Sequence, residues 1–473
     1  MRNPRDKLFV GPKIRALRER EALSLEVCAD RLGLSPSYLS QIETNQRPVT
    51  ARVLIALTRG FGVDPAEFDA DDESRLIADL KEASADLALG ATAPTLAEIK
   101  LAAATTPDLA RQFLALHRAY RSLDQRLKTL DENLALHAPE AAEAVLPYEE
   151  VRDFFHYRNN YVDELDRAAE TLAEQLGIGL GTSPVVLLEA ALDERHGVRS
   201  VRSSATAGDL LRRFDPTTRT LTLERDLPEP TRIFQLAVQL AELSFAEPIA
   251  GILATSGLKS KSAMDVARVG LANYAAGALL MPYRQFAAAA AELRHDIEQL
   301  QRRYAASFEQ VCHRLSTLQR PGARGVPFYF VRVDQAGNIT KRHSATRFQF
   351  ARFGGACPLW NVHEAFAQPG RILVQIAEMP DGARYLCIGR SIVKRSGSYL
   401  RPNRHYALGI GCEVSYADQL VYSTGLPLAG PAVPIGISCR ICERTDCPQR
   451  AFPPIDRGLV VPPNERHVVP YEL

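Results

Sequence analysis

The sequence has no long apolar run, and this absence excludes several classes of protein at the outset. No stretch approaches the roughly 18 consecutive apolar residues that a membrane-spanning helix needs. The first residues are charged and lead into no apolar core, so we expect no secretory signal and a cytoplasmic location. Internal repeats are also absent. The 473 residues, 46% hydrophobic and 24% charged, have the composition of a globular protein of about three domains.

The chain also has almost no net charge, +1 at neutral pH, but its charges are unevenly distributed. Residues 1–62 carry 11 Lys and Arg against 6 Asp and Glu, whereas residues 63–150 carry 8 against 18. A basic head beside an acidic middle favours a head that meets a polyanion.

Residues 24–43 have the pattern of two short helices joined by a tight turn. Residues 24–32 are amphipathic, and Gly33 allows the positive φ that a tight turn needs. Ser35 can cap the next helix, and Pro36 suits its first position. The sequence therefore predicts a helix-turn-helix, which we place within a domain of residues 1–65.

The second helix of this pair turns short polar side chains outward, which suits a major groove. The pattern LSxSYLSQIExNxRPV, starting at residue 34, resembles the Cro/CI-type helix-turn-helix family. The resemblance implies that Ser37, Gln41 and Asn45 read bases and that Arg47 contacts the DNA backbone. We expect six residues to form the DNA-reading surface: Ser37, Tyr38, Ser40, Gln41, Asn45 and Arg47. A small helical bundle that binds another protein is the alternative.

Residues 66–147 are rich in Ala and Leu and predict a helical linker. Eight apolar residues within them recur at alternating steps of four and three: Leu109, Phe113, Leu116, Tyr120, Leu123, Leu127, Leu130 and Leu134. This heptad spacing indicates a seam that joins a homodimer or a homotetramer. Packing of one long helix on the core of its own domain is the alternative.

Residues 148–320 are mainly helical, with strand-like pieces at 185–190 and 220–223. Residues 231–245 and 271–282 resemble, in that order, the metal-site helix and the second helix of the IrrE-like (M78) metallopeptidase family. The resemblance implies an α+β domain with a protease-like cleft.

The residues at this motif exclude zinc hydrolysis. The chemistry needs two imidazoles one helical turn apart and a carboxylate base, but Val238, Gln239 and Glu242 stand at those positions. An expected acidic ligand is also missing, since Val269 and Gly270 stand there. We therefore predict that the protein is not an enzyme and that the cleft is a cavity for a small ligand. A plain buried helix pair is the alternative.

Residues 321–473 are richer in Pro and Gly and contain short β-branched and aromatic runs. These runs predict strands at 328–333, 372–377, 384–388 and 407–411. Asp381 and Gly382 predict a hairpin turn. The predicted fold class is mainly α in the first two-thirds of the chain, followed by a strand-rich α+β domain.

Three of the eight cysteines form a C-x2-C-x4-C cluster, Cys439, Cys442 and Cys447, which ends in Cys-Pro as ferredoxin ligand loops do. Cytoplasmic thiols are reduced, so the cluster indicates Zn2+ or an iron–sulfur cluster rather than disulfides. Cys412 and Cys357 are candidates for a fourth ligand, and Cys412 is nearer in sequence. Three free thiols in a loop is the alternative.

Together these parts resemble the short-chain fatty acyl-CoA regulator family (ScfR). The most specific segments are 37–43, 272–283, 353–366 and 439–454. The resemblance implies a transcription regulator that binds operator DNA, senses a short acyl-CoA, first of all propionyl-CoA, and controls propionate or acetate assimilation. Some relatives are associated with a [4Fe–4S] cluster, which fits the cysteine cluster.

Candidate acyl-CoA contacts are chosen by residue type and motif position, because phosphates favour Arg and an adenine favours aromatic side chains. They surround the inactive cleft or follow in the next domain: Tyr157, Gln239, Asn273, Tyr274, Tyr283, Arg342, Arg347 and Phe350. For the last three, a strand with one charged, solvated face is the alternative. Four other functions stay open: an acetyl-CoA-responsive regulator of glyoxylate-type genes, a redox- or metal-responsive regulator, a metallopeptidase regulator and an antitoxin-type module.

Overall fold

A computed structural model describes residues 10–21, 23–44, 46–61, 70–84, 94–134, 145–179, 181–203, 210–258, 260–346, 348, 350, 356–397, 399–454, 460–466, 468–469 and 471. The chain forms two compact units, residues 1–127 with 450–473, and residues 128–449. Each unit is described by itself.

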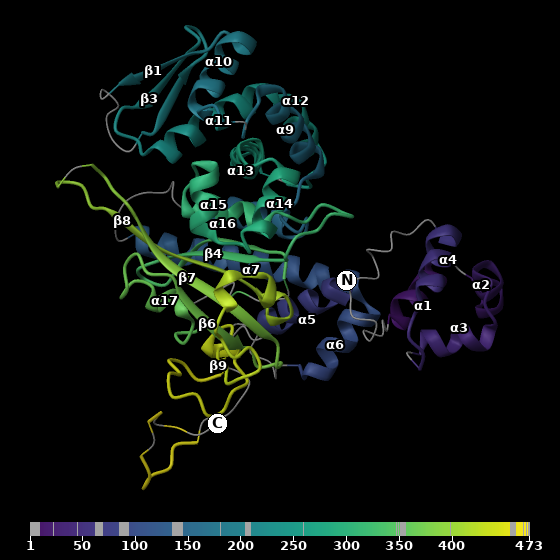
Figure 1. The fold of residues 1–473 in the computed structure, drawn as a ribbon. Helices are drawn as coiled ribbons and strands as arrows, with labels where there is room; N and C mark the ends of the chain where they lie inside the picture. Colours follow the sequence, from purple (N-terminus) through teal and green to yellow (C-terminus); the bar gives the residue numbers. More distant parts are fainter. Residues whose placement is uncertain are drawn as a thin grey trace. The chain divides into compact units, whose positions relative to one another are not determined.

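The first unit is helical (Figure 1). Its helices are α1 (Gly11–Arg20), α2 (Leu25–Leu32), α3 (Pro36–Glu43), α4 (Ala51–Phe61), α5 (Ala70–Ser84), α6 (Leu96–Thr105) and α7 (Pro107–Leu134). Helices α1–α4 share one core, in which Leu39, Ile42 and Leu57 are fully buried. Helices α5–α7 share a second, smaller core. The head therefore has an apolar centre of its own.

The second unit begins with nine helices in its described part. They are α8 (Val145–His156), α9 (Asp163–Leu176), α10 (Pro184–His196), α11 (Glu229–Ser244), α12 (Ala246–Ala254), α13 (Lys261–Leu280), α14 (Tyr283–Glu292), α15 (Ile297–Tyr304) and α16 (Phe308–Ser316). Helix α13 is central and packs against α8, α9, α11 and α12. This packing is possible because α13 carries mostly Ala and Leu on its buried positions.

A small sheet interrupts these helices. Its strands are β1 (Arg199–Ser203), β2 (Arg212–Asp215) and β3 (Thr220–Glu224), in the order β1-β3-β2, with β1 and β3 parallel. The strand predicted at 220–223 is confirmed as β3. The strand predicted at 185–190 is wrong, because these residues lie within α10. A short apolar run does not distinguish a buried helix from a strand, and Pro184 at the first helical turn starts a helix here.

The unit continues as a six-stranded sheet in the order β5-β4-β8-β7-β6-β9. Its strands are β4 (Tyr329–Asp334), β5 (Ile339–Ser344), β6 (Leu373–Glu378), β7 (Arg384–Lys394), β8 (Arg404–Glu413) and β9 (Val433–Pro434). Short helices lie between them, namely α17 (Asn361–Glu364), η4 (Val414–Gln419) and η5 (Val421–Ser423), and η6 (Cys439–Ile441) follows β9. Gly382 at φ 82° confirms the predicted hairpin turn between β6 and β7.

The two faces of this sheet pack against different partners. Phe330, Ile388 and Ile410 pack in one core with residues of helices α14–α16, and Tyr329 and Tyr385, which lie on the other face of the strands, pack in a second core with α17 and its flanking loops. Side chains alternate between the faces of a strand, so each strand contributes to both cores. The predicted fold class, helical first and strand-rich last, is confirmed.

Within the described residues no single helix is long and apolar enough to cross a bilayer, and α11 with α12 passes that test only as a pair bent by 71°.

Candidate functional site

The helix-turn-helix is built from two helices whose N-termini are capped by serine. The Ser24 hydroxyl accepts a hydrogen bond from the Val27 N–H at 3.2 Å, and the Ser35 hydroxyl accepts one from the Tyr38 N–H at 3.2 Å. Gly33, between the helices, has φ 65°. Each cap satisfies an N–H that the first helical turn leaves unpaired, so the turn is set by local sequence.

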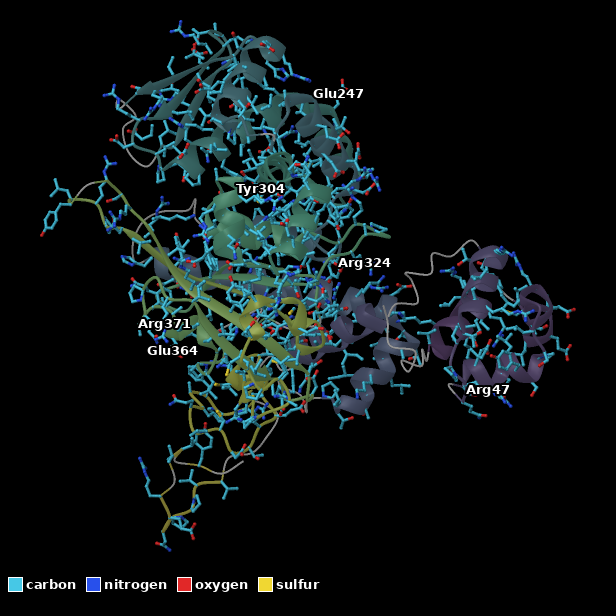
Figure 2. The ribbon with its side chains drawn as sticks, in the orientation of Figure 1. Arg47, Glu247, Tyr304, Arg324, Glu364 and Arg371 are labelled. Carbon is cyan, nitrogen blue, oxygen red and sulfur yellow. The ribbon has the colours of Figure 1, made fainter. Side chains whose placement is uncertain are left out.

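Helix α3 leaves the predicted base-reading residues within reach of a ligand. Five of the six are described and are exposed at least in part: Ser37, Tyr38, Ser40, Gln41 and Arg47. Asn45 lies outside the described residues. The Arg47 guanidinium lies over the ring of Tyr38, 5.6 Å from its centroid. Figure 2 labels Arg47 on the head. The arrangement can present short polar groups to base edges and a cation to phosphate.

An ion pair that sequence reasoning did not find ties α1 to the end of α3. Arg18 donates two hydrogen bonds to the Glu43 carboxylate, at 2.7 and 3.0 Å, and one to the Leu23 carbonyl at 3.1 Å. The hydrogen bond to Glu43 raises the pKa of Arg18. Both side chains are mostly buried, and a two-pronged pair of this kind fixes orientation as well as energy. It holds the recognition helix at one angle to the rest of the head.

The heptad stripe of α7 faces outward. Leu109, Leu116 and Leu123 are 64%, 70% and 58% exposed, whereas the buried face of α7 is formed by Ala110 and Leu114. The side chains of Leu127, Leu130 and Leu134 lie outside the description. Phe113, which belongs to the same stripe, packs against the core of α5–α7. The leucines of the described stripe are therefore exposed, and only Phe113 supports the alternative of packing on the unit's own core.

An arginine stands at the place where a metallopeptidase holds its metal. Arg212, on β2, donates hydrogen bonds to the Gln239 side-chain oxygen and to Glu242 at 2.9 Å. Val238, the remaining motif position, is buried in the apolar core. Gln239 cannot act as a base, and the Glu242 carboxylate is neutralised by the arginine. The site therefore has the fold of a protease centre and none of its ligands.

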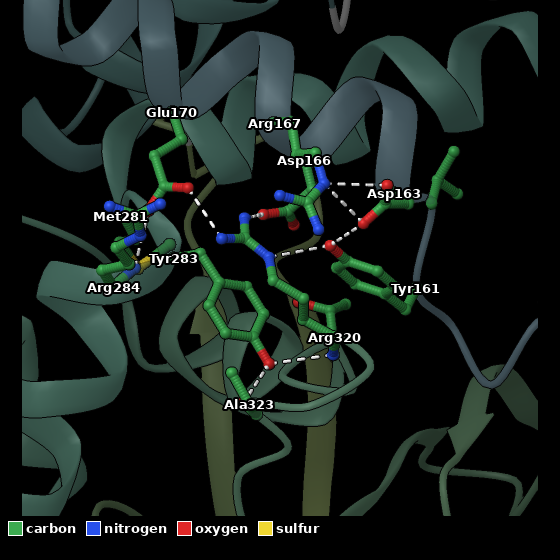
Figure 3. A network of polar contacts seen from close by, with 12 residues as sticks. Tyr161, Asp163, Asp166, Arg167, Glu170, Met281, Tyr283, Arg284, Arg320 and Ala323 are labelled. Atoms are coloured by element: carbon green, nitrogen blue, oxygen red, sulfur yellow. Dashed lines mark hydrogen bonds and ion pairs between the residues drawn. The ribbon is translucent and has the colours of Figure 1, made fainter.

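Two predicted ligand contacts, Tyr274 and Tyr283, are only 4% and 1% exposed. The Tyr274 hydroxyl donates to Asp166 at 2.7 Å and accepts from the Val162 N–H at 3.1 Å. The Tyr283 hydroxyl donates to the Ala323 carbonyl and accepts from the Arg320 N–H, both at 2.9 Å (Figure 3). Burial raises the pKa of both phenols. The structure argues against the prediction that they line a cleft, because both hydroxyls are already partnered inside the protein.

These tyrosines belong to a buried network of charges on α9, α16 and the segment after α16. Figure 3 shows the part around Asp166, Glu170 and Arg320. Asp166 is fully buried and accepts hydrogen bonds from Arg314 at 2.6 Å and Arg320 at 3.1 Å. Arg320 also donates to Glu170 at 2.8 Å and to the Tyr161 hydroxyl at 2.9 Å. Buried charges are tolerated when each is paired in this way. The network joins the protease-like helices to the start of the sheet domain.

The other predicted ligand contacts are not gathered in one place. Tyr157 is 50% exposed after α8, and Asn273 is partly buried on α13. Arg342 lies on β5, and Phe350 packs in the aromatic core beside Trp360. Arg347 lies outside the described residues. None of them lines the cavity of about 520 Å³ beside β6.

The cysteine cluster lies near Cys357 rather than Cys412. Burial raises the pKa of Cys357, and its sulfur accepts hydrogen bonds from the backbone N–H groups of Gly436 and Leu359. The thiols of Cys439 and Cys442 are close enough to raise that pKa further. Cys357 is thus the better candidate for a fourth ligand.

Cys412 is fully buried on β8, on the sheet face that packs against α14–α16. Burial raises its pKa, and Cys387 is the thiol near it. The prediction of Cys412 as a ligand with the partly exposed Cys447 therefore finds no support. In the part of the chain that the structure describes, no three His, Cys, Asp or Glu side chains are arranged to hold a metal ion.

Comparison with known proteins finds family matches for three parts of the chain. Residues 10–70 match a helix-turn-helix domain, residues 193–316 an IrrE N-terminal-like domain of the M78 peptidases, and residues 317–471 the C-terminal domain of short-chain fatty acyl coenzyme A regulators. A propionyl-CoA carboxylase regulator from Cereibacter sphaeroides is 50% identical over 99% of both chains. The chain belongs to the short-chain fatty acyl-CoA regulator family.

Other ScfR relatives agree. The transcriptional regulator RamB of Mycobacterium tuberculosis is 44% identical over 98% of both chains. A solved structure of a Mycobacterium tuberculosis transcriptional regulator is 48% identical, with a TM-score of 0.67, and covers 69% of this chain and 99% of its own. With its helix-turn-helix domain, this ScfR member is a DNA-binding transcriptional regulator, and the relatives named here are regulators too.

Sequence reasoning about this ScfR chain missed Arg212, the pair of Arg18 with Glu43, and the Asp166 network. Only Glu43 left a signal in the sequence. It follows Leu39 by four residues and so lies on the buried face of α3, where an acidic side chain needs a cation. Arg212 lies 27 residues before its partner on a different element, and no local pattern connects them.

Proposed function

We propose that this regulator senses a short-chain acyl-CoA in the cytoplasm, with propionyl-CoA as the first choice, and so controls genes of propionate or acetate assimilation. The observation that carries the proposal is the match of residues 317–471 to the C-terminal domain of short-chain fatty acyl-CoA regulators. The name of the Cereibacter sphaeroides relative, a propionyl-CoA carboxylase regulator, supports propionyl-CoA as the ligand and its carboxylase genes as the target.

The state of the protease-like centre supports a binding role rather than hydrolysis. Metal-assisted hydrolysis requires ligands that hold the ion and a base that takes a proton from water. Here Arg212 donates hydrogen bonds to both Gln239 and Glu242, and Val238 offers no ligand atom. The domain contributes structure, and the acyl-CoA supplies the signal.

In this proposal the acyl-CoA acts by preferring one arrangement of the chain over another. A ligand shifts such an equilibrium only by the difference in its affinity for the two states, typically about 1–3 kcal/mol. Two heads in a dimer can read two half-sites together. We propose the exposed stripe of α7 as the surface that brings the two heads together in a homodimer or homotetramer.

Calorimetry on the full chain with acetyl-, propionyl- and butyryl-CoA tests the sensor, with free CoA as the control. We expect propionyl-CoA to bind most tightly and to change operator affinity by about 5- to 150-fold. Tightest binding of acetyl-CoA would move the target to glyoxylate-type genes. If no acyl-CoA binds below the millimolar range, the sensor proposal is refuted.

The position of Cys357 favours a second candidate, a redox- or metal-responsive regulator. The cysteines as placed do not form a three-ligand group, so we derive no step through a metal. Metal analysis of anaerobically purified protein tests this candidate, and we expect Cys357→Ser to lower the metal content more than Cys412→Ser. The candidate also requires that air oxidation releases DNA while acyl-CoA has no effect. An absence of bound metal in the unmodified chain would eliminate the metal-responsive form, and DNA binding that survives air oxidation would eliminate the redox-responsive form.

A further inference from the structure

A cavity of about 520 Å³ lies beside β6, in the sheet domain of the second unit. One wall is β6 itself, and the opposite wall is the segment 426–433 that leads into β9. Leu426, Pro427 and Val433 give this wall an apolar surface. The volume lies within the range of small-molecule sites, and the site described above uses none of these residues.

The edge of β6 that faces the cavity is open. Strand β9 pairs with β6 only at Ala377 and Glu378, so no described strand continues the pairing upstream on that side. The Glu378 carbonyl accepts a hydrogen bond from the Ile435 N–H, which shows that Glu378 directs its backbone groups outward. In an antiparallel strand every second residue does so. Val374 therefore directs its N–H and C=O into the cavity. Ile376 directs only its N–H there, because the pairing of Ala377 with Val433 uses the Ile376 carbonyl.

Proline explains why the edge stays open. Pairing extended upstream from β9 would need backbone N–H donors from the segment 426–433. Pro431 and Pro427 lack this group and line the cavity. The sheet thus ends in a short slot with unpaired amide groups on one side and apolar side chains on the other.

The rim of the slot carries a chain of polar side chains. Arg371 donates to the Gln368 side-chain oxygen at 2.9 Å, and Gln368 donates to Glu364 at 2.6 Å. Arg371 and Glu364 are both exposed and lie on the same side of the sheet domain in Figure 2. Arg371 therefore offers a cation at the mouth of the slot, with Glu364 at the far end of the hydrogen-bonded chain.

We infer that this slot receives the pantetheine arm of the acyl-CoA, an inference that rests on the proposed function. Pantetheine is an extended chain with two amides, and an open strand edge supplies the donors and acceptors that such amides need. The apolar wall suits its methylene groups, and Arg371 suits the phosphates that follow it. The slot is too short for a long added peptide strand, because β9 closes one end.

Two variants test this inference on the full chain. Arg371→Glu reverses the charge at the mouth on an exposed side chain, and we expect it to weaken propionyl-CoA binding at least tenfold. Val374→Pro removes one outward N–H at an edge strand, where proline is tolerated, and should also weaken binding. The matched control is Arg324→Glu, on an exposed arginine that does not line the slot and is labelled in Figure 2.

Hydrogen exchange supplies a readout that does not depend on either variant. We expect propionyl-CoA to slow amide exchange at residues 372–376 and to leave the exposed tip of the β7–β8 hairpin unchanged. If the unmodified chain binds propionyl-CoA but Arg371→Glu binds equally well and 372–376 are not protected, the slot assignment is wrong and the sensor function stands. Protection of this segment by an added peptide and not by propionyl-CoA would also overturn it. If the unmodified chain binds no acyl-CoA, both proposals fail.

Discussion

The DNA-binding head and the protease-like body both descend from recognisable motifs, but they keep different parts of them. In the head, α3 still presents the polar residues of its motif at the surface. In the body, the motif helix α11 keeps its packing, and its polar side chains Gln239 and Glu242 are hydrogen-bonded to Arg212. A fold survives the loss of its chemistry when the freed polar groups find partners inside the protein. The comparison teaches that a motif match alone says which helices exist, and the partners of its side chains say what they do.

The body should be far more sensitive than the head to the loss of one buried charge. Asp166→Ala leaves Arg314 without its carboxylate and Arg320 with Glu170 alone, and we expect the free energy of unfolding to fall by about 3–5 kcal/mol. Denaturant unfolding followed by the fluorescence of Trp360, the single tryptophan, measures it. Glu292→Ala, which breaks an exposed pair with Arg303, is the control and should cost less than about 1 kcal/mol. Equal effects of the two variants would contradict the role of burial.

Mild acid should lower the stability of the body more than that of the head, which is the next largest effect. Burial lowers the pKa of both His313 and His343 well below the usual value, helped by the nearby Lys341, whereas residues 1–62 contain no histidine. Below about pH 6.5 these histidines bind protons in the unfolded chain but stay neutral in the folded body. The free energy of unfolding therefore decreases as the pH decreases, by up to about 1.4 kcal/mol per pH unit for each histidine. Hydrogen exchange between pH 7 and 5 measures this, and the amides of α16 should lose protection before those of α3.

The groups that face these two rings are known. The His343 Nδ1–H donates a hydrogen bond to the Asn160 side-chain oxygen at 3.1 Å, the His343 ring centre lies 4.7 Å from that of His313, and His156 adds a repulsive charge. Replacing His343 with Phe should flatten the acid response, and replacing the exposed His405 should not. An unchanged pH dependence in His343→Phe would assign the effect to other groups.

Removing Arg212 should have a smaller effect that is confined to the body. Arg212→Ala leaves the buried Gln239 oxygen without its donor, which costs about 1–3 kcal/mol. Thermal unfolding with Arg213→Ala as the control measures the difference, because Arg213 is the exposed neighbour on the same strand. A protein that is as stable without Arg212 would show that the arginine only fills space.

The smallest effects on stability should be found in the head, where the variants change DNA reading instead. Gln41→Ala should alter the preference at one base pair by about 1–3 kcal/mol, because a side-chain contact to a base edge is lost. Arg47→Ala should weaken all sequences alike and reduce the salt dependence by about one ion. Binding to operator variants at several salt concentrations distinguishes the two. A uniform loss with Gln41→Ala would mean that Gln41 contacts the backbone.

Local chemistry could be predicted from the sequence, and long-range partners could not. The Ser35 cap and Gly33 of the head, and the hairpin at Gly382, follow from the residues themselves because caps and tight turns are made within a few positions. The four strands predicted for the C-terminal domain are also present, since short runs of β-branched and aromatic residues define them locally.

The predicted site residues were harder, because burial decides them. Tyr274 resembled a ligand contact by type, but Asp166, more than a hundred residues earlier, takes its hydroxyl. Cys412 was preferred as a metal ligand for its nearness in sequence to Cys439, yet the pleat of β8 turns it to the opposite face of the sheet from Cys357. Nearness along the chain says little about which face of a strand a side chain takes.

The buried Asp166 has a practical consequence for anyone who divides this protein into parts. The boundary between the two matched domains falls at 316 and 317, which separates Arg314 from Arg320, although both hold the same carboxylate. A fragment that ends at residue 316 would lack Arg320, which pairs with Asp166 and Glu170. A fragment that begins at residue 317 would keep Arg320 but lack both carboxylates. A fragment that contains the sheet should therefore also contain α9, which carries Asp166 and Glu170.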